Sequence, residues 1–100
     1  MRGAAIVFAA LIGAAQAQPA APEVFRGSTA ETAIVLPGVA DEFHGVAAEH
    51  AYIARNFPTW HIEYQTRMAQ DGKRYDLIGM VKPDLTKIAV FFDITDWVGK

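Results

Sequence analysis

The sequence predicts an α+β fold, in which one amphipathic helix packs on a three-stranded antiparallel β-meander (α-β-β-β) after a signal peptide. Three observations predict it. Residues from Trp60 to Met68 alternate between apolar and polar, which is typical of a half-buried strand. Asp71-Gly72 then signals a tight hairpin, because a type I′ turn needs positive φ at both positions. Upstream, residues 41–57 repeat apolar residues at spacings of three and four, as an amphipathic helix does.

The chain begins with the three parts of a secretory signal peptide. Arg2 supplies a positive start, residues 4–15 are apolar, and Ala15-Gln16-Ala17 is a small-x-small cleavage site. The apolar run is shorter than the ~20 residues that a membrane-spanning helix needs. We therefore expect residues 1–17 to be removed, leaving a periplasmic or secreted protein without a membrane span. An uncleaved N-terminal anchor or a buried helix is the alternative.

The processed chain is expected to be one small acidic domain. Removal of residues 1–17 leaves 83 of the 100 residues, and the loss of Arg2 changes the formal net charge from −2 to −3. This balance argues against nucleic-acid binding, which normally requires a basic surface. The sequence has no cysteine, which excludes disulfides, thiolate metal sites and cysteine nucleophiles.

Residues 18–38 are predicted to be a flexible arm, followed by the α+β domain over residues 39–100. Residues 33–36 favour β-structure and end at Pro37-Gly38. This short run adds an edge strand to the sheet or simply docks on the core, and the sequence leaves both open.

The helix is predicted to begin at Asp41, a suitable N-cap, and to end before Pro58, which disfavours helical φ and ψ at the preceding residue. Its apolar residues form one stripe that we expect to face the sheet: Phe43, Val46, Ala47, Ala51, Ala54 and Phe57. The many alanines would let the helix lie close to the sheet. In the tail, Trp97 is expected to fold over the edge of the core, and exposure to a partner is the alternative.

A two-residue loop at Asp71-Gly72 determines the pairing of the first two strands. One face then pairs apolar side chains: Met68 with Tyr75, Thr66 with Leu77, Tyr64 with Gly79, and Ile62 with Val81. The other face pairs Arg67 with Asp76, Gln65 with Ile78, and Glu63 with Met80. Because the first face is apolar throughout, we expect the helix to cover it.

A four-residue loop, Pro83-Asp84-Leu85-Thr86, is predicted between the second and third strands. It pairs Val81 with Ile88, Gly79 with Val90, Leu77 with Phe92, and Tyr75 with Ile94. The same register places Arg67, Asp76 and Asp93 in one row across the outer face of the sheet.

The residues expected on the outer face of the sheet predict a protein contact surface there. Ile78, Met80 and Phe91 are expected to form an apolar patch there, with Arg67 at its charged rim. The partner is expected to be another protein or a second copy of this chain as a homodimer. The alternative is that the N-terminal segment covers the patch.

No catalytic residue, cofactor or metal site is predicted. His44, His50 and His61 lack the spacing of a ligand set. The alternative is a metal- or ligand-binding protein or enzyme centred on Asp76, Asp93 and Arg67, because two neighbouring carboxylates can act as a general acid/base pair or hold a cation. A structural ion pair between Arg67 and Asp76 is the simpler interpretation.

Several short motifs resemble a PepSY-type domain, including the PepSY-like periplasmic proteins. The motifs are Ala51-x-x-Ala54, Phe57-Pro58-x-Trp60, Asp71-Gly72, Tyr75-Asp76 and Val90-Phe91-Phe92-Asp93. The resemblance implies a helix followed by three strands, in an exported binding or inhibitory module. The chain departs from the family pattern at its C-terminal end, because residues 94–98 separate Asp93 from Gly99, a longer spacing than the family usually has. The expected function is therefore a non-enzymatic exported binding module, such as a protease modulator, with a homodimerising accessory domain as a further alternative.

Overall fold

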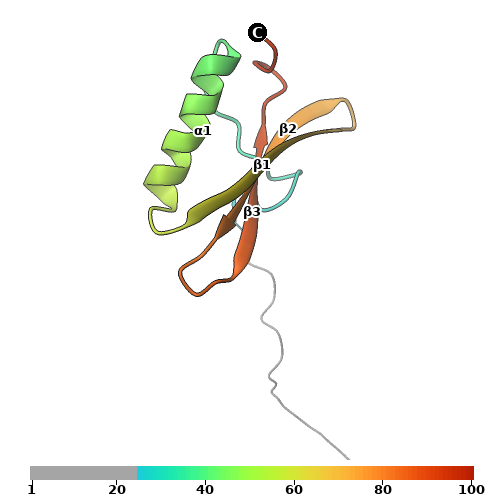
Figure 1. Cartoon of the computed structure of the whole chain (residues 1–100). Helices are drawn as coiled ribbons and strands as arrows, with labels where there is room; N and C mark the ends of the chain where they lie inside the picture. Colours follow the sequence, from blue (N-terminus) through green and yellow to red (C-terminus); the bar gives the residue numbers. More distant parts are fainter. Residues whose placement is uncertain (1–24) are drawn as a thin grey trace, which may run out of the picture.

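The structure is a computed structural model that describes residues 25–100. It contains helix α1 (Glu42–Asn56) and a three-stranded antiparallel sheet of β1 (His61–Gln70), β2 (Lys73–Val81) and β3 (Lys87–Asp93), in the order β1-β2-β3 (Figure 1). The predicted α+β fold with the order α-β-β-β is confirmed. The predicted signal peptide and the first part of the arm, residues 1–24, lie outside the described residues.

Helix α1 begins and ends where the sequence predicts. The side chain of Asp41 accepts a hydrogen bond from the backbone N–H of His44 at 2.8 Å, which satisfies one of the free donors of the first turn. At the other end the N–H of Phe57 donates to the carbonyl of Ile53 at 2.8 Å, and Pro58 follows. Both caps come from residues that the sequence analysis singled out.

The orientation of α1 differs from the prediction. The helix buries Gly45, Glu49 and Ile53, whereas Phe43 on the predicted inner stripe is 80% exposed. The other members of that stripe are exposed or half-buried: Ala47, Ala51 and Ala54 are exposed, and Val46 and Phe57 are half-buried. The ring of Trp97 packs directly on Gly45, at the position that a Cβ atom would occupy. Because the helix makes its close contact with Trp97 at Gly45, the predicted apolar stripe on another side of the helix faces outward.

The first hairpin follows the predicted turn. Asp71 and Gly72 have φ values of 53° and 79°, as a type I′ turn requires. The register predicted from this turn is confirmed between the pairs Gln70–Lys73 and Tyr64–Gly79. It fails at the start of β1, where a β-bulge between Ile62 and Tyr64 pairs Ile62 with Met80 instead of Val81.

The register predicted for the second hairpin is wrong by one residue. The N–H of Lys82 donates to the carbonyl of Thr86 at 2.9 Å, so three residues rather than four form the loop. Leu85 adopts a φ of 72°, the left-handed residue that follows a type I turn in such loops. The observed partners are Gly79 with Ala89, Leu77 with Phe91, Asp76 with Phe92, and Tyr75 with Asp93.

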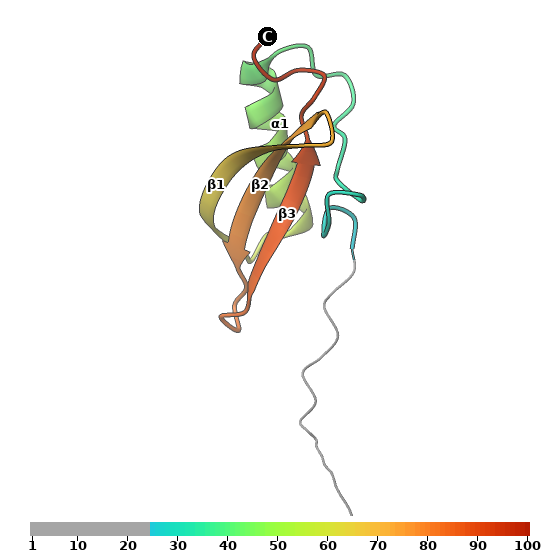
Figure 2. The same cartoon turned by 90° about the vertical axis from the view of Figure 1, so that its right-hand side faces the viewer.

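This shift moves the side chains of β3 to the opposite face relative to those of β2. The covered face, which packs against α1, carries the fully buried Ile78, Met80, Val90 and Phe92. Tyr52 of α1 contacts Phe92 edge-to-face, with ring centroids 5.6 Å apart. In Figure 2 α1 lies behind the sheet, so the face turned to the viewer is the one that the helix does not cover. The face predicted to lie under the helix on β1 and β2 is thus the open one.

The N-terminal segment covers the free edge of β3 (Figure 2). Ile34 forms a single parallel bridge with Phe92, where its N–H donates to the carbonyl of Phe91 and its carbonyl accepts from Asp93, both at 2.9 Å. The carbonyl of Gly27 accepts from the N–H of Phe91 at 2.7 Å. Of the two outcomes open for residues 33–36, the structure has docking through one bridge rather than a full strand.

The C-terminal tail closes one end of the core. Trp97 is 2% exposed, which confirms that it folds over the core edge instead of pointing into solvent. In the part of the chain from Phe25 onward, no helix has the length and apolarity needed to cross a membrane.

Candidate functional site

The face of the sheet turned away from α1, which we call the open face, is apolar. Tyr64, Met68, Tyr75, Leu77 and Phe91 alternate with the residues that face the helix, and so lie on it. Tyr64 is 48% exposed and its ring covers Gly79, where any added Cβ would overlap it. Tyr75 and Phe91 meet edge-to-face, with centroids 6.3 Å apart. The open face is therefore a preformed, partly exposed aromatic and aliphatic surface.

An ion pair lies at each end of the open face. Nζ of Lys73 is 3.8 Å from Oδ2 of Asp93 at the end near the first turn. At the opposite end Nζ of Lys87 is 3.2 Å from Oε2 of Glu63. Each pair is neutral in sum, so the rim offers local polar contacts without a strong field of either sign.

The predicted contact residues do not form one patch. Ile78 and Met80 are 0% and 1% exposed and lie in the core beneath α1, so their predicted position on the outer face is wrong. Phe91 is half-buried on the open face. Arg67 points toward α1, on the covered face. The register shift in the second hairpin explains why Phe91 and Ile78 lie on different faces.

A polar network joins α1 to the covered face. Nε of Arg67 is 3.0 Å from Oδ1 of Asp76, and a terminal guanidinium nitrogen is 2.9 Å from Oε2 of Glu42. The side-chain amide of Gln65 donates to both Glu49 and Asp76 at 3.3 Å. Glu49 and Asp76 are each 0% exposed. The predicted structural pair of Arg67 and Asp76 is confirmed, but inside the helix–sheet interface.

Glu49 holds its proton at neutral pH. Burial, and secondarily a hydrogen bond with Asp76, raise the pKa of Glu49 to about 9, against a weaker opposing effect of Arg67. Oε2 of Glu49 is buried and has no hydrogen-bond partner among the described residues. The network therefore combines a carboxyl group with a raised pKa, a second buried carboxyl group and a guanidinium.

The predicted row of Arg67, Asp76 and Asp93 is wrong. Asp76 pairs with Phe92, whereas Asp93 lies on the open face and accepts hydrogen bonds from the N–H and hydroxyl of Thr95 at 3.0 and 2.6 Å. Asp76 and Asp93 therefore cannot act together on a substrate or cation. In the described part of the chain, no three histidine or acidic side chains come close enough to hold a metal ion.

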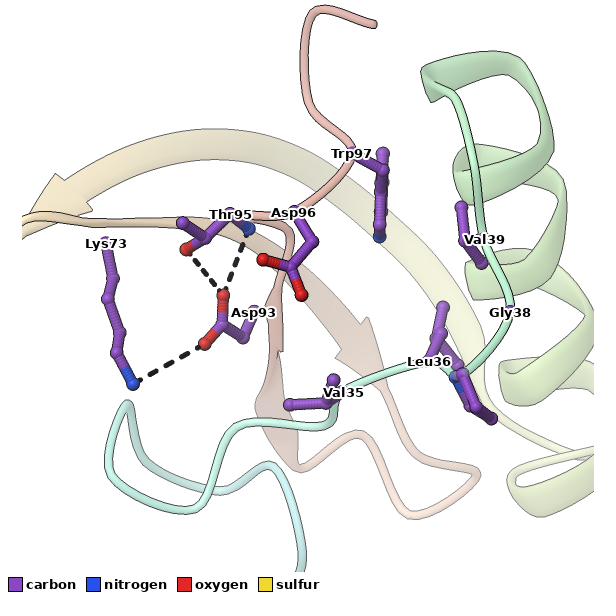
Figure 3. A pocket seen from close by; sticks show the side chains of 10 residues that line it. Val35, Leu36, Gly38, Val39, Lys73, Asp93, Thr95, Asp96 and Trp97 are labelled. Atoms are coloured by element: carbon purple, nitrogen blue, oxygen red, sulfur yellow. Dashed lines mark hydrogen bonds and ion pairs between the residues drawn. The ribbon is translucent and has the colours of Figure 1, made fainter.

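A cavity of about 390 Å³ lies between residues 35–39 and residues 93–97 (Figure 3). The indole nitrogen of Trp97 points into this region, but it is shielded from solvent and has no hydrogen-bond partner among the described residues. Asp93 is already engaged by Thr95 and Lys73. Asp96, the other carboxylate that lines the cavity, is exposed to solvent, so we assign the cavity no ligand.

Two sets of residues were missed by the sequence analysis. The sequence places Tyr64 and Leu77 beneath the helix, although they lie on the open face together with Phe91, whereas Tyr75 on that face is buried at 6% exposure. Glu49 was not singled out, because a glutamate within a helix is ordinarily solvated. The one available signal was its position: Glu49 lies four residues from both Gly45 and Ile53, on one helical face.

Comparisons of this chain with models of protein families, with curated proteins and with solved structures found no match.

Proposed function

We propose that this protein is a small exported, non-enzymatic binding module that docks an uncharged, apolar polypeptide segment on its open face. The observation that carries the proposal is the half-exposed cluster of Tyr64, Leu77 and Phe91 on a face that no element of residues 25–100 covers. Contiguous apolar surface with a polar rim is typical of protein contact sites.

The chemistry of the open face favours a polypeptide over other ligands. It is a sheet surface with aromatic and aliphatic side chains, which suits the side chains of another chain. The rim pairs Lys73–Asp93 and Lys87–Glu63 are neutral in sum, so they favour neither a polyanion nor a cationic peptide. An uncharged apolar segment gains from burial and leaves both ion pairs in water.

Export is part of the proposal. It is supported by the signal-peptide pattern of residues 1–17 and by the absence of cysteine, which leaves the fold independent of redox conditions. The resemblance to PepSY-type domains supports the same class of function, an exported module that modulates a protease. The chain would then act by occupying its partner, with no chemical step.

We propose no catalytic role for the buried carboxyl groups. Glu49 and Asp76 are 0% exposed, which leaves a substrate no route to either group. Their partners are Gln65 and Arg67, both from this chain. The network is better suited to holding α1 on the sheet than to acid/base chemistry.

A site-specific photo-cross-linker tests the proposal in exporting cells. Benzoylphenylalanine in place of Phe91 should capture a partner through an uncharged apolar segment, identified by mass spectrometry. The same group in place of Leu85, which is 78% exposed at the far loop, is the matched control and should not capture it. Equal capture at both positions, or at neither, contradicts the proposal.

The captured partner is then purified and its affinity measured. Phe91→Ser and Leu77→Ser should each weaken binding at least about tenfold, because both remove apolar contact at the centre of the surface. Leu85→Ser, which removes a 78% exposed side chain at the far loop, should bind as the wild type does. Unchanged affinity in both open-face variants would refute the proposed surface.

A further inference from the structure

The outward side of α1 is unusually apolar. We call it the outer stripe, and it consists of the exposed residues Phe43, Ala47, Ala51 and Ala54. Phe43 at its first turn is 80% exposed, the largest exposed fraction among the large apolar side chains in residues 25–100. An apolar groove continues from Phe43, Val46 and Ala47 to the tail at Gly99. Exposed aromatic surface of this kind usually has a partner.

We propose that the outer stripe is an interface between two copies of this chain, packed as antiparallel helices about a two-fold axis. The side chains of the stripe are large at the N-terminal end of α1, where Phe43 lies, and small toward its C-terminal end, where Ala51 and Ala54 lie. An antiparallel pair places each Phe43 over Ala51 and Ala54 of the second copy. A two-fold axis repeats this large-to-small contact, as an isologous interface requires.

Charge supports the same arrangement. Asp41 stands at the N-terminal end of α1, and Arg55 lies in its last turn. The guanidinium of Arg55 is exposed and has no ion pair or hydrogen bond with another described residue. Antiparallel packing brings Arg55 to the end of the second helix that carries Asp41, whereas parallel packing places Arg55 beside Arg55. The macrodipoles of the two helices also oppose one another in the antiparallel pair.

The small residues set the geometry of the contact. Alanines at positions 47, 51 and 54 let two helix backbones approach closely, and they leave room for the ring of Phe43. The residues of the outer stripe are exposed, and α1 lies on the covered side of the sheet (Figure 1), so the stripe and the open face lie on opposite sides of the domain. The inference therefore does not depend on the proposed function.

Sedimentation of the processed chain, residues 18–100, tests the proposal from about 1 µM to 1 mM. We expect a reversible monomer–dimer equilibrium in this range. Phe43→Ser should raise the dissociation constant at least about tenfold, whereas Leu85→Ser, at a comparably exposed leucine, should leave it unchanged. A monomer at every concentration, or a dimer that Phe43→Ser leaves intact, overturns the proposal. Circular dichroism of each variant shows that it is folded.

A complementary pair of substitutions tests the large-to-small contact. Phe43→Ala removes the ring, and Ala54→Phe crowds the place that the ring occupies, so each alone should weaken the dimer. The double variant exchanges the two sizes and should restore association to within about threefold of the wild type. Additive loss in the double variant contradicts the facing of positions 43 and 54.

Disulfide trapping tests the helix direction, since the natural chain has no cysteine. In the antiparallel pair position 47 lies close to the two-fold axis, so Ala47→Cys should form a cross-linked dimer under mild oxidation. The two copies of position 54 are then roughly 16 Å apart along the helices, beyond the ~7 Å reach of a disulfide. Efficient cross-linking of Ala54→Cys would show parallel helices and overturn the arrangement.

Discussion

The two faces of the sheet differ in the side chains that they bury and expose: the covered face combines an apolar core with buried polar groups, whereas the open face leaves apolar side chains partly exposed. The covered face buries the carboxyl group of Asp76 together with Gln65 and Arg67, beneath a helix that itself contributes Glu49. The open face instead presents Tyr64 and Leu77 to solvent. Alternation along a strand reveals that two faces exist, but it does not reveal which of them the helix covers. That choice depends on the neighbouring strand and on the packing of the helix.

The polar groups of the covered face are stabilised by hydrogen bonds and an ion pair, except for Oε2 of Glu49, which has no partner among the described residues. Glu49 keeps its proton and Arg67 balances Asp76, so only compensated charges are buried. Around this network lie Ile78, Phe92 and Ile94, all 0% exposed. The apolar core thus lies mainly between α1, β2 and β3, and the polar network lies toward β1.

The largest difference in stability should appear when neighbouring residues on the two faces of β2 are replaced by alanine. Ile78→Ala should lower the free energy of unfolding by about 2–5 kcal/mol, because it leaves a cavity in the core. Leu77→Ala, on the open face, should cost less than half as much, because its side chain is only half-buried. Urea denaturation measures both. Equal losses would show that the two faces do not differ as described.

Because Trp97 packs on Gly45, the substitution Gly45→Ala should change the free energy of unfolding in the direction opposite to that expected from helix propensity. By helix propensity alone, Gly45→Ala would stabilise the protein by about 1 kcal/mol. Because the added methyl group meets the indole ring, we expect destabilisation by about 1–3 kcal/mol and a red shift of tryptophan fluorescence. Ala47→Gly at an exposed position of the same helix, measured on the dilute monomer, is the control and should lose only the propensity difference. Stabilisation by Gly45→Ala would refute the contact.

The buried network should make stability depend on pH. Glu49 has a pKa of about 9 in the folded chain and about 4.5 when unfolded, so the folded state retains a proton that the unfolded state releases between these values. The free energy of unfolding should therefore be highest below about pH 4.5, with respect to this group, and decrease as pH rises toward 9.

Glu49→Gln keeps the shape of the side chain and removes its titration. We expect the decrease in stability from pH 5 to 9, measured by urea denaturation, to become shallower in this variant. Glu31→Gln, at an exposed glutamate, is the matched control and should retain the wild-type slope. An identical slope in Glu49→Gln would mean that Glu49 is already ionised in the folded protein.

The smallest effect concerns the loop that sets the register of β3. Leu85 has a φ of 72°, a left-handed conformation that asparagine adopts more readily than leucine. Leu85→Asn should raise the free energy of unfolding by up to about 1 kcal/mol. Leu85→Ala removes the same side chain but keeps the backbone strain, so it should not stabilise. A gain in both variants would point to the side chain instead of the backbone.

Much of the fold could be predicted from local signals. Asp41, Pro58 and Asp71-Gly72 define the ends of α1 and the first turn through their own backbone preferences, and all three predictions are confirmed. The second register could not be predicted, because a leucine at position 85 gives no sign of positive φ. A glycine or asparagine there would have indicated the three-residue loop.

The site was harder to predict than the fold. Phe91 was correctly assigned to an outward-facing position, but its proposed neighbours Ile78 and Met80 were not. A one-residue error in register transfers a whole strand to the other face, so a surface prediction fails where a topology prediction succeeds. The orientation of α1 failed for a different reason, because its most closely packed residue, Gly45, has no side chain to signal burial.

The opposite placement of the outer stripe and the open face has a consequence for binding strength. Two domains joined back to back through α1 would present their open faces in opposite directions, as a bivalent unit. A partner that carries the recognised segment twice, or that is itself clustered, would be held at both ends. Such avidity can exceed the affinity of a single face by about 10²–10⁴-fold without any additional contact.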